Sequence, residues 1–379
     1  MKESKKVKAV DYIPADITPE ILSRTSLETL GRCRLVSKEF QQIAYDPNFL
    51  QNFSERTKTV SGIVIDLEFN PTPIFIDVAN HNNQSALKHS SFTLFEENNF
   101  RFRILAASKC GILFCKTKED KYYVCKPTTK QWQQIPTPSI PWTITVVHGM
   151  VVFGSAPLRY KIVVFVPRNW CKSKYSCHIF DSETWAWKQL KDPLQIPVNS
   201  HHFSYTSNAA VSVCGKLYWR LKGEPNSEIL QFDFEDESWD IFELPRPLCK
   251  FRYCRYTLLV EYKGRLGLIC SFVRKIEKCD CMELWVMEGQ NTWTKAHKFC
   301  IMSLKNKLPH IDCHEPVALL NSDLLVYRSG ISTSKVILFK LQDCSFKAVE
   351  LKCFLGFSVF YVFQSDLELV NFRGSSDQV

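Results

Sequence analysis

The residues best suited to binding a metal ion lie in one short segment, His310-Ile311-Asp312-Cys313-His314. Two histidines four residues apart on one face of a helix can bind a single zinc ion. Pro309 and Pro316 bracket this segment, however, and leave little room for a helix. No fourth ligand is evident nearby, so an ordinary loop is the favoured interpretation, and we expect no metal and no cofactor.

Two other clusters are weaker candidates for chemistry. Cys279-Asp280-Cys281 lacks the two-residue spacer and the second pair of a zinc site, and is typical of a loop or strand edge. A second cluster alternates basic and aromatic residues, a pattern that can bind RNA or an acidic ligand but also describes a half-exposed strand, which we favour. Its members are Arg246, Lys250, Arg252 and Arg255 with Phe251, Tyr253 and Tyr256.

Composition and the absence of motifs narrow the possible functions. The sequence contains no phosphate-binding loop, no G-x-S-x-G motif and no dinucleotide fingerprint, so nothing in it predicts an enzyme. The net charge of +9 is spread thinly over 379 residues, which argues against a nucleic-acid partner. The most apolar stretches, residues 144–153 and 354–363, are too short for a transmembrane helix of about 20 residues, so no membrane span is expected.

The cysteines and the N-terminus indicate the compartment. The 16 cysteines follow no regular spacing, and the first residues contain no apolar signal core. We therefore expect reduced cysteines and residence in the cytoplasm, the nucleus or both.

The first 57 residues are predicted to be helical. A basic, flexible tail is expected over residues 1–10. Over residues 11–57, Thr18-Pro19, Ser26 and Asp46-Pro47 are helix-start signals followed by apolar residues at helical spacing. Because about 45 residues of short helices cannot form a large core alone, this unit is expected to complete its burial against a partner or the next domain.

From residue 58 to residue 379 the pattern changes to strands broken by turn residues. A motif of a strand, a polar turn and an aromatic residue recurs at spacings of 53, 54, 54 and 53 residues. Its aromatic residues are Trp132, Trp185, Trp239, Trp293 and Phe346. A unit of about 50 residues with several strands is typical of a kelch-like propeller blade, in which the ring packs between neighbouring blades. A β-sandwich with coincidental spacing is the alternative.

The number of blades and the closure of the ring follow from the ends of this region. Five clear repeats and a degenerate unit in residues 60–105 predict about six blades. A propeller leaves no open edge only when its first and last strands meet. We therefore expect residues 60–78 to lie beside residues 357–363 and 367–370, with the helical unit next to this seam.

The helical unit resembles the F-box of plant proteins. The resemblance lies in Ile13-Pro14-Ala15-Asp16-Ile17, in residues 20–24 and 30–40, and in Asp46-Pro47-Asn48-Phe49, where the family has Asp-Pro-x-Phe. Thr25-Ser26 stands where the family usually has Leu-Pro, and Phe40 where it usually has Trp. Both positions supply apolar surface in the family, so the resemblance leaves a weaker affinity for the partner open.

The strand region resembles the F-box-associated domain that follows the F-box in many plant proteins. Residues 126–132 match its Asn-Pro-x-Thr-x-x-Trp, with Lys126 in place of Asn. Gly215-Lys216-Leu217-Tyr218-Trp219 matches its Gly-x-x-His-Trp, and Glu283-Leu284-Trp285-Val286 contains its Leu-Trp-Val. The two resemblances imply a small N-terminal all-α F-box over residues 11–57, followed by an all-β propeller of about six blades over residues 58–379.

The resemblance also implies a function. The F-box would dock on a Skp1-type subunit, and through it on cullin, while the propeller holds an unknown protein target for ubiquitination, so the chain would be a non-catalytic ubiquitin-ligase subunit. Two alternatives stay open: an interaction protein whose decayed F-box acts outside a ligase, and a propeller enzyme. The apolar residues expected to dock, some of which must instead form the F-box core, are Ile13, Pro14, Ile17, Ile21, Leu22, Leu27, Leu30, Val36 and Phe40.

Overall fold

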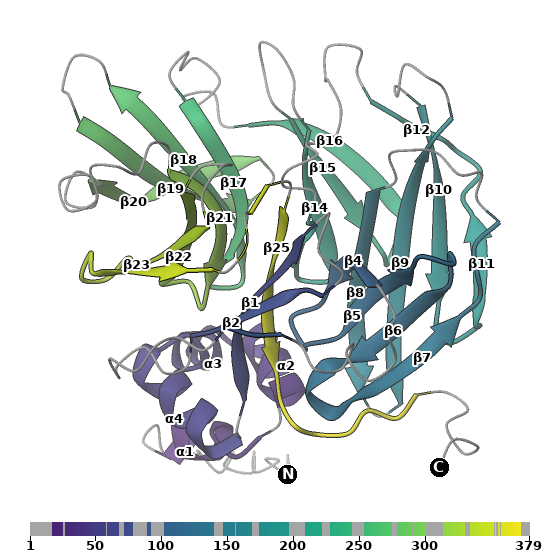
Figure 1. The fold of residues 1–379 in the computed structure, drawn as a ribbon, viewed down its shortest axis with the longest axis horizontal. Helices are drawn as coiled ribbons and strands as arrows, with labels where there is room; N and C mark the ends of the chain where they lie inside the picture. Colours follow the sequence, from purple (N-terminus) through teal and green to yellow (C-terminus); the bar gives the residue numbers. More distant parts are fainter. Residues whose placement is uncertain are drawn as a thin grey trace, which may run out of the picture.

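In the computed structural model, the described residues form four short helices packed against one end of a ring of β-sheets (Figure 1). The residues that the structure describes are 17–25, 27–57, 59–67, 72–78, 89–91, 102–139, 147–155, 157–168, 174–196, 209–221, 228–244, 254–274, 279–289, 291–300, 314–329, 334–351, 353, 355–356 and 358–372.

The helices are α1 (Ile17–Leu22), α2 (Leu27–Val36), α3 (Lys38–Ala44) and α4 (Pro47–Thr57). Local sequence explains where the last two begin. The Ser37 side chain accepts a hydrogen bond from the Phe40 amide, and the Asp46 carboxylate accepts one from the Phe49 amide. Both are N-cap interactions, and Pro47 fits the first helical position because its missing N–H has no intrahelical partner there. The predicted start at Asp46-Pro47 is confirmed.

The strands form six antiparallel sheets, which confirms a six-bladed propeller and excludes the sandwich. The first blade is β4 (Phe102–Ala107), β5 (Leu113–Thr117), β6 (Tyr122–Lys126) and β7 (Gln131–Ile135), with a 3₁₀ turn at Pro127–Thr129. The second is β8 (Val147–Ser155), β9 (Leu158–Pro167), β10 (Lys174–Asp181) and β11 (Ala186–Gln189), with β12 (Leu194–Gln195) beside β10. The third is β13 (Val211–Val213), β14 (Lys216–Leu221), β15 (Glu228–Asp233) and β16 (Ser238–Glu243).

The fourth blade is β17 (Cys254–Tyr262), β18 (Arg265–Arg274), β19 (Cys279–Gly289) and β20 (Thr292–Cys300). The fifth is β21 (His314–Leu320), β22 (Leu324–Ser329), β23 (Lys335–Lys340) and β24 (Phe346–Glu350). The sixth joins both ends of the chain in the order β25 (Ser358–Ser365), β1 (Val60–Leu67), β2 (Ile74–Asp77) and β3 (His89–Ser91).

The sixth blade closes the ring. β25 and β1 pair antiparallel over the whole of both strands, from Val60 opposite Ser365 to Leu67 opposite Ser358, and they lie side by side in Figure 1. The predicted meeting of residues 60–78 with residues 357–363 is therefore confirmed for the described strands.

The chain beyond β25 leaves the seam, whereas the sequence predicts that residues 367–370 lie beside residues 60–78. Residues 366–372, here called the C-terminal strap, cross the first and second blades instead. Lys126 donates to the Asp366 carboxylate and to the Glu368 carbonyl, and Gln131 exchanges two hydrogen bonds of 2.8 Å with the Val370 backbone. The Leu158 amide donates to the Asn371 carbonyl at 2.9 Å. The expectation was wrong because polar partners on the neighbouring blades bind this segment.

The repeated aromatic position is real, but the spacing identified the wrong tryptophan in one blade. Trp132, Trp239, Trp293 and Phe346 lie at the start of the outermost strand of their blades. In the second blade Trp187 takes this place, opposite Phe180, whereas Trp185 lies in the preceding turn with φ +58°. Residues two positions before the other aromatics have the same left-handed backbone: Lys130, Glu237, Asn291 and Cys344.

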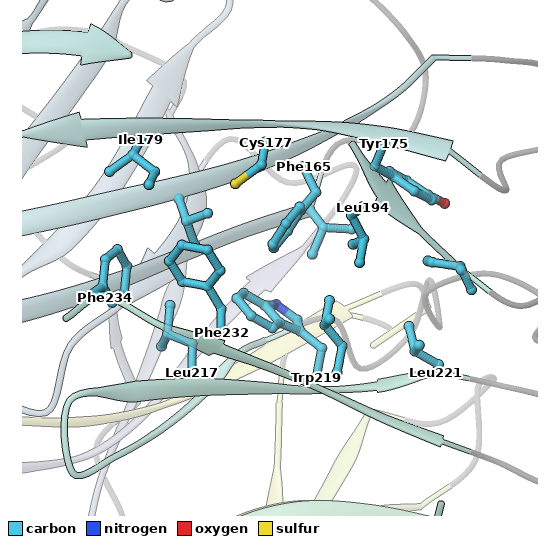
Figure 2. Packing of buried hydrophobic residues seen from close by; sticks show 14 of the residues in the cluster. Phe165, Tyr175, Cys177, Ile179, Leu194, Leu217, Trp219, Leu221, Phe232 and Phe234 are labelled. Atoms are coloured by element: carbon cyan, nitrogen blue, oxygen red, sulfur yellow. The ribbon is translucent and has the colours of Figure 1, made fainter. Parts of the chain in front are cut away.

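Most of the core lies between adjacent blades. Figure 2 shows Phe165 and Cys177 of the second blade facing Trp219 and Phe232 of the third. The Phe165 ring lies 5.5 Å from Trp219 and 5.9 Å from Phe232, both edge-on, which is a favourable aromatic arrangement.

The repeated aromatics take part in this inter-blade packing with one exception. Trp239 packs against the cluster between the second and third blades, Trp293 against the next cluster, and Phe346 against the one after it. Trp132 is 50% exposed and contacts the Tyr123 ring of its own blade. Among the described residues, Trp132 is therefore half exposed and does not show the expected packing between blades.

Candidate functional site

The F-box contains a small core of its own. Leu22, Leu27 and Leu30 are buried, and the partly buried Phe40 packs against them. The other buried members of this cluster are Ala44, Phe49 and Phe53. Four of the nine apolar residues predicted for docking therefore contribute to the core of the domain.

Three other predicted docking residues are exposed. Ile17 is 44% exposed, Ile21 47% and Val36 75%. Ile17 and Ile21 are four residues apart on α1 and so share one face of that helix. Val36 is the last residue of α2. Ile13 and Pro14, the remaining two, lie outside the described residues.

Polar contacts hold α1 in place so that this face points outward. The Glu20 carboxylate binds Arg24 at 2.7 Å and Arg56 of α4 at 2.9 Å. Hydrogen bonds from Arg24 and then Arg56 lower the pKa of Glu20, so the carboxylate stays charged. The Thr25 hydroxyl donates to the Leu22 carbonyl at 2.8 Å, so this departure from the family pattern serves to end α1.

A cluster of polar side chains joins the F-box to the propeller. The Tyr45 hydroxyl donates to Glu261 Oε1 at 2.5 Å, and the Gly264 amide donates to the same oxygen at 2.5 Å. Lys109 Nζ lies 3.2 Å from Glu261 Oε2, and Arg34 lies over the Tyr45 ring at 4.5 Å. We call these five residues the junction cluster.

Electrostatics keep the junction cluster charged. Burial acts to raise the pKa of Glu261, but Lys109, the Tyr45 hydroxyl, the Gly264 amide and Arg34 outweigh it and hold the pKa below its ordinary value. Glu261 therefore binds the F-box as a carboxylate at neutral pH.

Two further contacts fix the orientation of the F-box. Gln41 donates to the Lys263 carbonyl at 2.9 Å, and Arg32 donates to the Phe153 carbonyl at 3.3 Å. The turn at Lys263 and Gly264 has positive φ at both residues, and a Cβ at Gly264 would lie 2.5 Å from the Gln41 side chain. The tight turn and its glycine thus allow close approach of α3.

The F-box adjoins the closing seam through the chain, as expected, but its side-chain contacts also reach other blades. α4 ends at Thr57 and β1 begins at Val60, so the F-box is joined covalently to the closing blade. The hydrogen bonds of Arg32, Gln41 and Tyr45, however, go to the second and fourth blades. No local pattern predicts these contacts, since Tyr45 and Glu261 are 216 positions apart in the chain.

The other candidates for chemistry lie partly outside the described residues and form no metal site within them. Within the described ranges, no group of three or more His, Cys, Asp or Glu side chains is placed to hold a metal ion. His310 and Cys313 lie outside those ranges, as does most of the basic and aromatic segment. The Cys279-Asp280-Cys281 segment lies in strand β19, where Cys281 is buried. No described helix is long and apolar enough to span a membrane.

Comparison with known proteins matches both parts of the chain. Residues 10–55 match the F-box-like family, and residues 65–367 match the family described as "F-box associated beta propeller domain". Among solved structures, the SapL1 lectin in complex with alpha methyl fucoside aligns over 77% of this chain and 97% of its own, with 11% identity and a TM-score of 0.41.

Several relatives in Arabidopsis thaliana are named F-box proteins. F-box protein At1g30790 is 24% identical over 76% of this chain and 75% of its own length. F-box protein At5g18160 is 26% identical over 74% and 69%, and F-box protein CPR1 is 22% identical over 88% and 85%. The chain therefore belongs to the plant F-box proteins that carry an F-box associated β-propeller domain.

Proposed function

We propose that this protein is the target-recognition subunit of a Skp1-cullin-F-box ubiquitin ligase. The observation that carries the proposal is the division of apolar residues in the F-box. Leu22, Leu27 and Leu30 complete a core, whereas Ile17, Ile21 and Val36 remain exposed on a small domain. Ile17 and Ile21 share one face of α1, and an exposed apolar face of this kind is typical of a protein interface.

The partner that fits this surface is a Skp1-type subunit. Burial of apolar area stabilises a complex by roughly 25 cal/mol per Å², so three aliphatic side chains supply several kcal/mol before the costs of association. The family membership supports the choice of a Skp1-type partner, and through it cullin. Phe40 and Thr25, which differ from the family pattern, serve inside the F-box, where Phe40 packs on the core and Thr25 ends α1.

On this proposal the protein performs no bond chemistry. It raises the effective concentration of target lysines near the ubiquitin-charged enzyme that the rest of the complex carries. The junction cluster supports this role because it holds the F-box in one orientation on the propeller. A rigid connection keeps the bound target at a constant distance from the ligase.

The target is expected to bind at the end of the propeller away from the F-box. The F-box contacts the end that carries tight turns, such as Lys263-Gly264 between β17 and β18. At the opposite end, the outermost strand of one blade ends and the innermost strand of the next begins, as at Glu243 of β16 and Cys254 of β17. The connection between two blades therefore starts and ends there. Binding residues commonly lie on such connections because a rigid scaffold positions them. The cytoplasm or the nucleus, where such ligases would act, is the proposed location.

Affinity purification from plant cells with the proteasome inhibited tests the whole proposal. The full-length protein is expected to capture a Skp1-type subunit, cullin and at least one protein that accumulates when degradation is blocked. The Ile21→Asp/Val36→Asp variant is expected to lose the ligase subunits and keep the target. If the unchanged protein captures the same target without any Skp1-type subunit, it acts outside a ligase and the proposal is wrong.

A further inference from the structure

The centre of the propeller contains a cavity whose floor is made by the F-box. Its volume is about 570 Å³, and its walls come mainly from the inner strands β17, β21 and β25. Arg34 and Tyr45 of the F-box line it at the junction cluster. Sites for small molecules typically have volumes of about 300–1,000 Å³. The cavity is therefore large enough for a compact organic molecule.

The cavity lining carries more positive than negative charge. Four cationic side chains line it, against two carboxylates. The cations are Arg34, Lys109, Arg220 and Arg328, and the carboxylates are Glu261 and Glu315. Lys109 is exposed, but the three arginines are partly or fully buried, and buried charge is unfavourable unless it is compensated. The excess of positive charge therefore favours an anionic occupant.

The charges gather at the two ends of the cavity. Lys109 and Arg34 surround Glu261 at the F-box end. Farther from the F-box, Arg328 binds the Glu315 carboxylate, and Arg220 donates to the Thr257 carbonyl at 2.8 Å. Between them the lining is largely apolar, with Leu259, Val317, Phe360 and Val362 among its residues. An occupant that fits this arrangement combines an apolar body with an acidic group.

We propose that this central cavity binds a small molecule with an apolar body and an acidic group. Because Arg34 and Tyr45 form its floor, the bound molecule contacts the F-box and the propeller together and stabilises their junction. This site is separate from docking on a Skp1-type subunit and from binding of a protein target, and it does not depend on either.

A matched pair of fluorescent probes tests the site in the full-length protein. 8-Anilinonaphthalene-1-sulfonate has an aromatic body and a sulfonate, whereas N-phenyl-1-naphthylamine has the same body without the charge. The anionic probe is expected to bind saturably at one site per chain, at least tenfold more tightly than the neutral probe. Equal affinities, or binding that does not saturate, would overturn the proposal.

Variants locate the binding. Arg34→Met is expected to weaken the anionic probe about tenfold and leave the neutral probe unchanged, while Arg24→Met, on an arginine outside the cavity, changes neither. Val317→Phe, or Ala210→Phe should the first variant misfold, fills the cavity and is expected to abolish both signals. Near-UV circular dichroism verifies the fold of each variant. Unaltered binding in a folded, cavity-filled variant would place the probe elsewhere and contradict the proposal.

Hydrogen exchange tests the contact with the F-box. The bound anionic probe is expected to slow amide exchange in residues 38–45, which include Tyr45, because the occupant stabilises the junction. Residues 50–57 of α4 serve as the internal control and should not change. Protection absent from residues 38–45 at saturating probe would contradict the coupling to the F-box.

Discussion

The F-box and the propeller bury their apolar residues in different ways. In the described part of the chain, seven large apolar side chains are exposed, and three of them lie in the four F-box helices. The propeller family matches a segment about seven times longer than the F-box family does. The rest of the chain nevertheless contributes only four of the seven: Trp132, Phe153, Leu367 and Leu369. The F-box is a domain with a complete core and an uncovered surface, whereas the propeller is closed on itself.

The difference follows from how each domain is assembled. Each blade of the propeller shares a hydrophobic cluster with its neighbour, and β25 completes the ring by pairing with β1. The F-box has one cluster of six buried residues, too small to cover every apolar side chain on four helices. A surface of this kind is available for a partner without any change in the fold.

Removal of the closing strand is expected to have the largest effect. Truncation after residue 353 deletes β25 and the C-terminal strap, which exposes the whole edge of β1 and the buried Val370 and Phe372 sites. The truncated protein is expected to aggregate and to lose near-UV circular dichroism. Truncation after residue 372 is the control and should leave the fold intact. A soluble, folded protein ending at residue 353 would show that the ring does not depend on this strand.

A charge in the F-box core is the next largest change. Leu30 is fully buried, so Leu30→Asp places a carboxylate without a partner in the core and is expected to lower the free energy of F-box unfolding by about 3–5 kcal/mol. Ile21→Asp, on an exposed position, is expected to change it by less than about 0.5 kcal/mol. Urea denaturation of both full-length variants measures the two values. Similar losses would contradict the division into core and surface.

Packing between blades predicts a smaller difference between two tryptophans. Trp239 packs against the cluster shared by the second and third blades, so Trp239→Ala is expected to cost about 2–4 kcal/mol. Trp132 is half exposed, so Trp132→Ala is expected to cost about 1 kcal/mol or less. The same denaturation experiment compares them. Equal costs would mean that Trp132 also packs between blades.

Because Asp66 is buried in the closing blade, we expect the stability of the protein to depend on pH. Burial raises its pKa to about 7, against the opposing effects of Arg103 and the Ile104 amide. The folded state therefore keeps a proton that the unfolded state loses near pH 4, so stability falls as pH rises from about 4 to about 7.

The Asp66→Asn variant removes this dependence. It is expected to equal the unchanged protein near pH 4 and to be more stable by about 1–3 kcal/mol at pH 8. Unfolding free energies at the two pH values measure the difference, and Glu119→Gln, in an exposed turn, is the control. A variant that is no more stable at pH 8 would show that the Asp66 carboxyl ionises in the fold at no cost.

Local signals predicted much of the architecture. Asp46-Pro47 marked the start of α4, and recurrent turn and aromatic phrases predicted about six blades. The same spacing could not choose between Trp185 and Trp187, because residues two positions apart fit one period equally well and only the turn geometry separates them.

Local sequence patterns could not predict contacts between residues far apart in the chain. The apolar residues predicted for docking have similar chemistry, and only the packing of the helices decides that Leu30 faces the core while Ile21 faces outward. Tyr45 with Glu261, and Lys126 with Asp366, join residues more than two hundred positions apart. Lys126 stands where the family usually has Asn, yet nothing near it in sequence indicates the strap that it binds.

Titration of the full-length protein with a purified plant Skp1-type subunit tests the central claim most directly. Ile21→Asp is expected to weaken binding at least tenfold, about 1.4 kcal/mol, without lowering the melting temperature. Leu369→Asp, on a leucine of the strap that is 76% exposed, is the matched control and should bind like the unchanged protein. The predicted result is that the unchanged protein and Leu369→Asp bind equally well and that Ile21→Asp binds more weakly. Equal binding by all three proteins, or none by any of them, would contradict the assignment of the exposed F-box face as the docking surface.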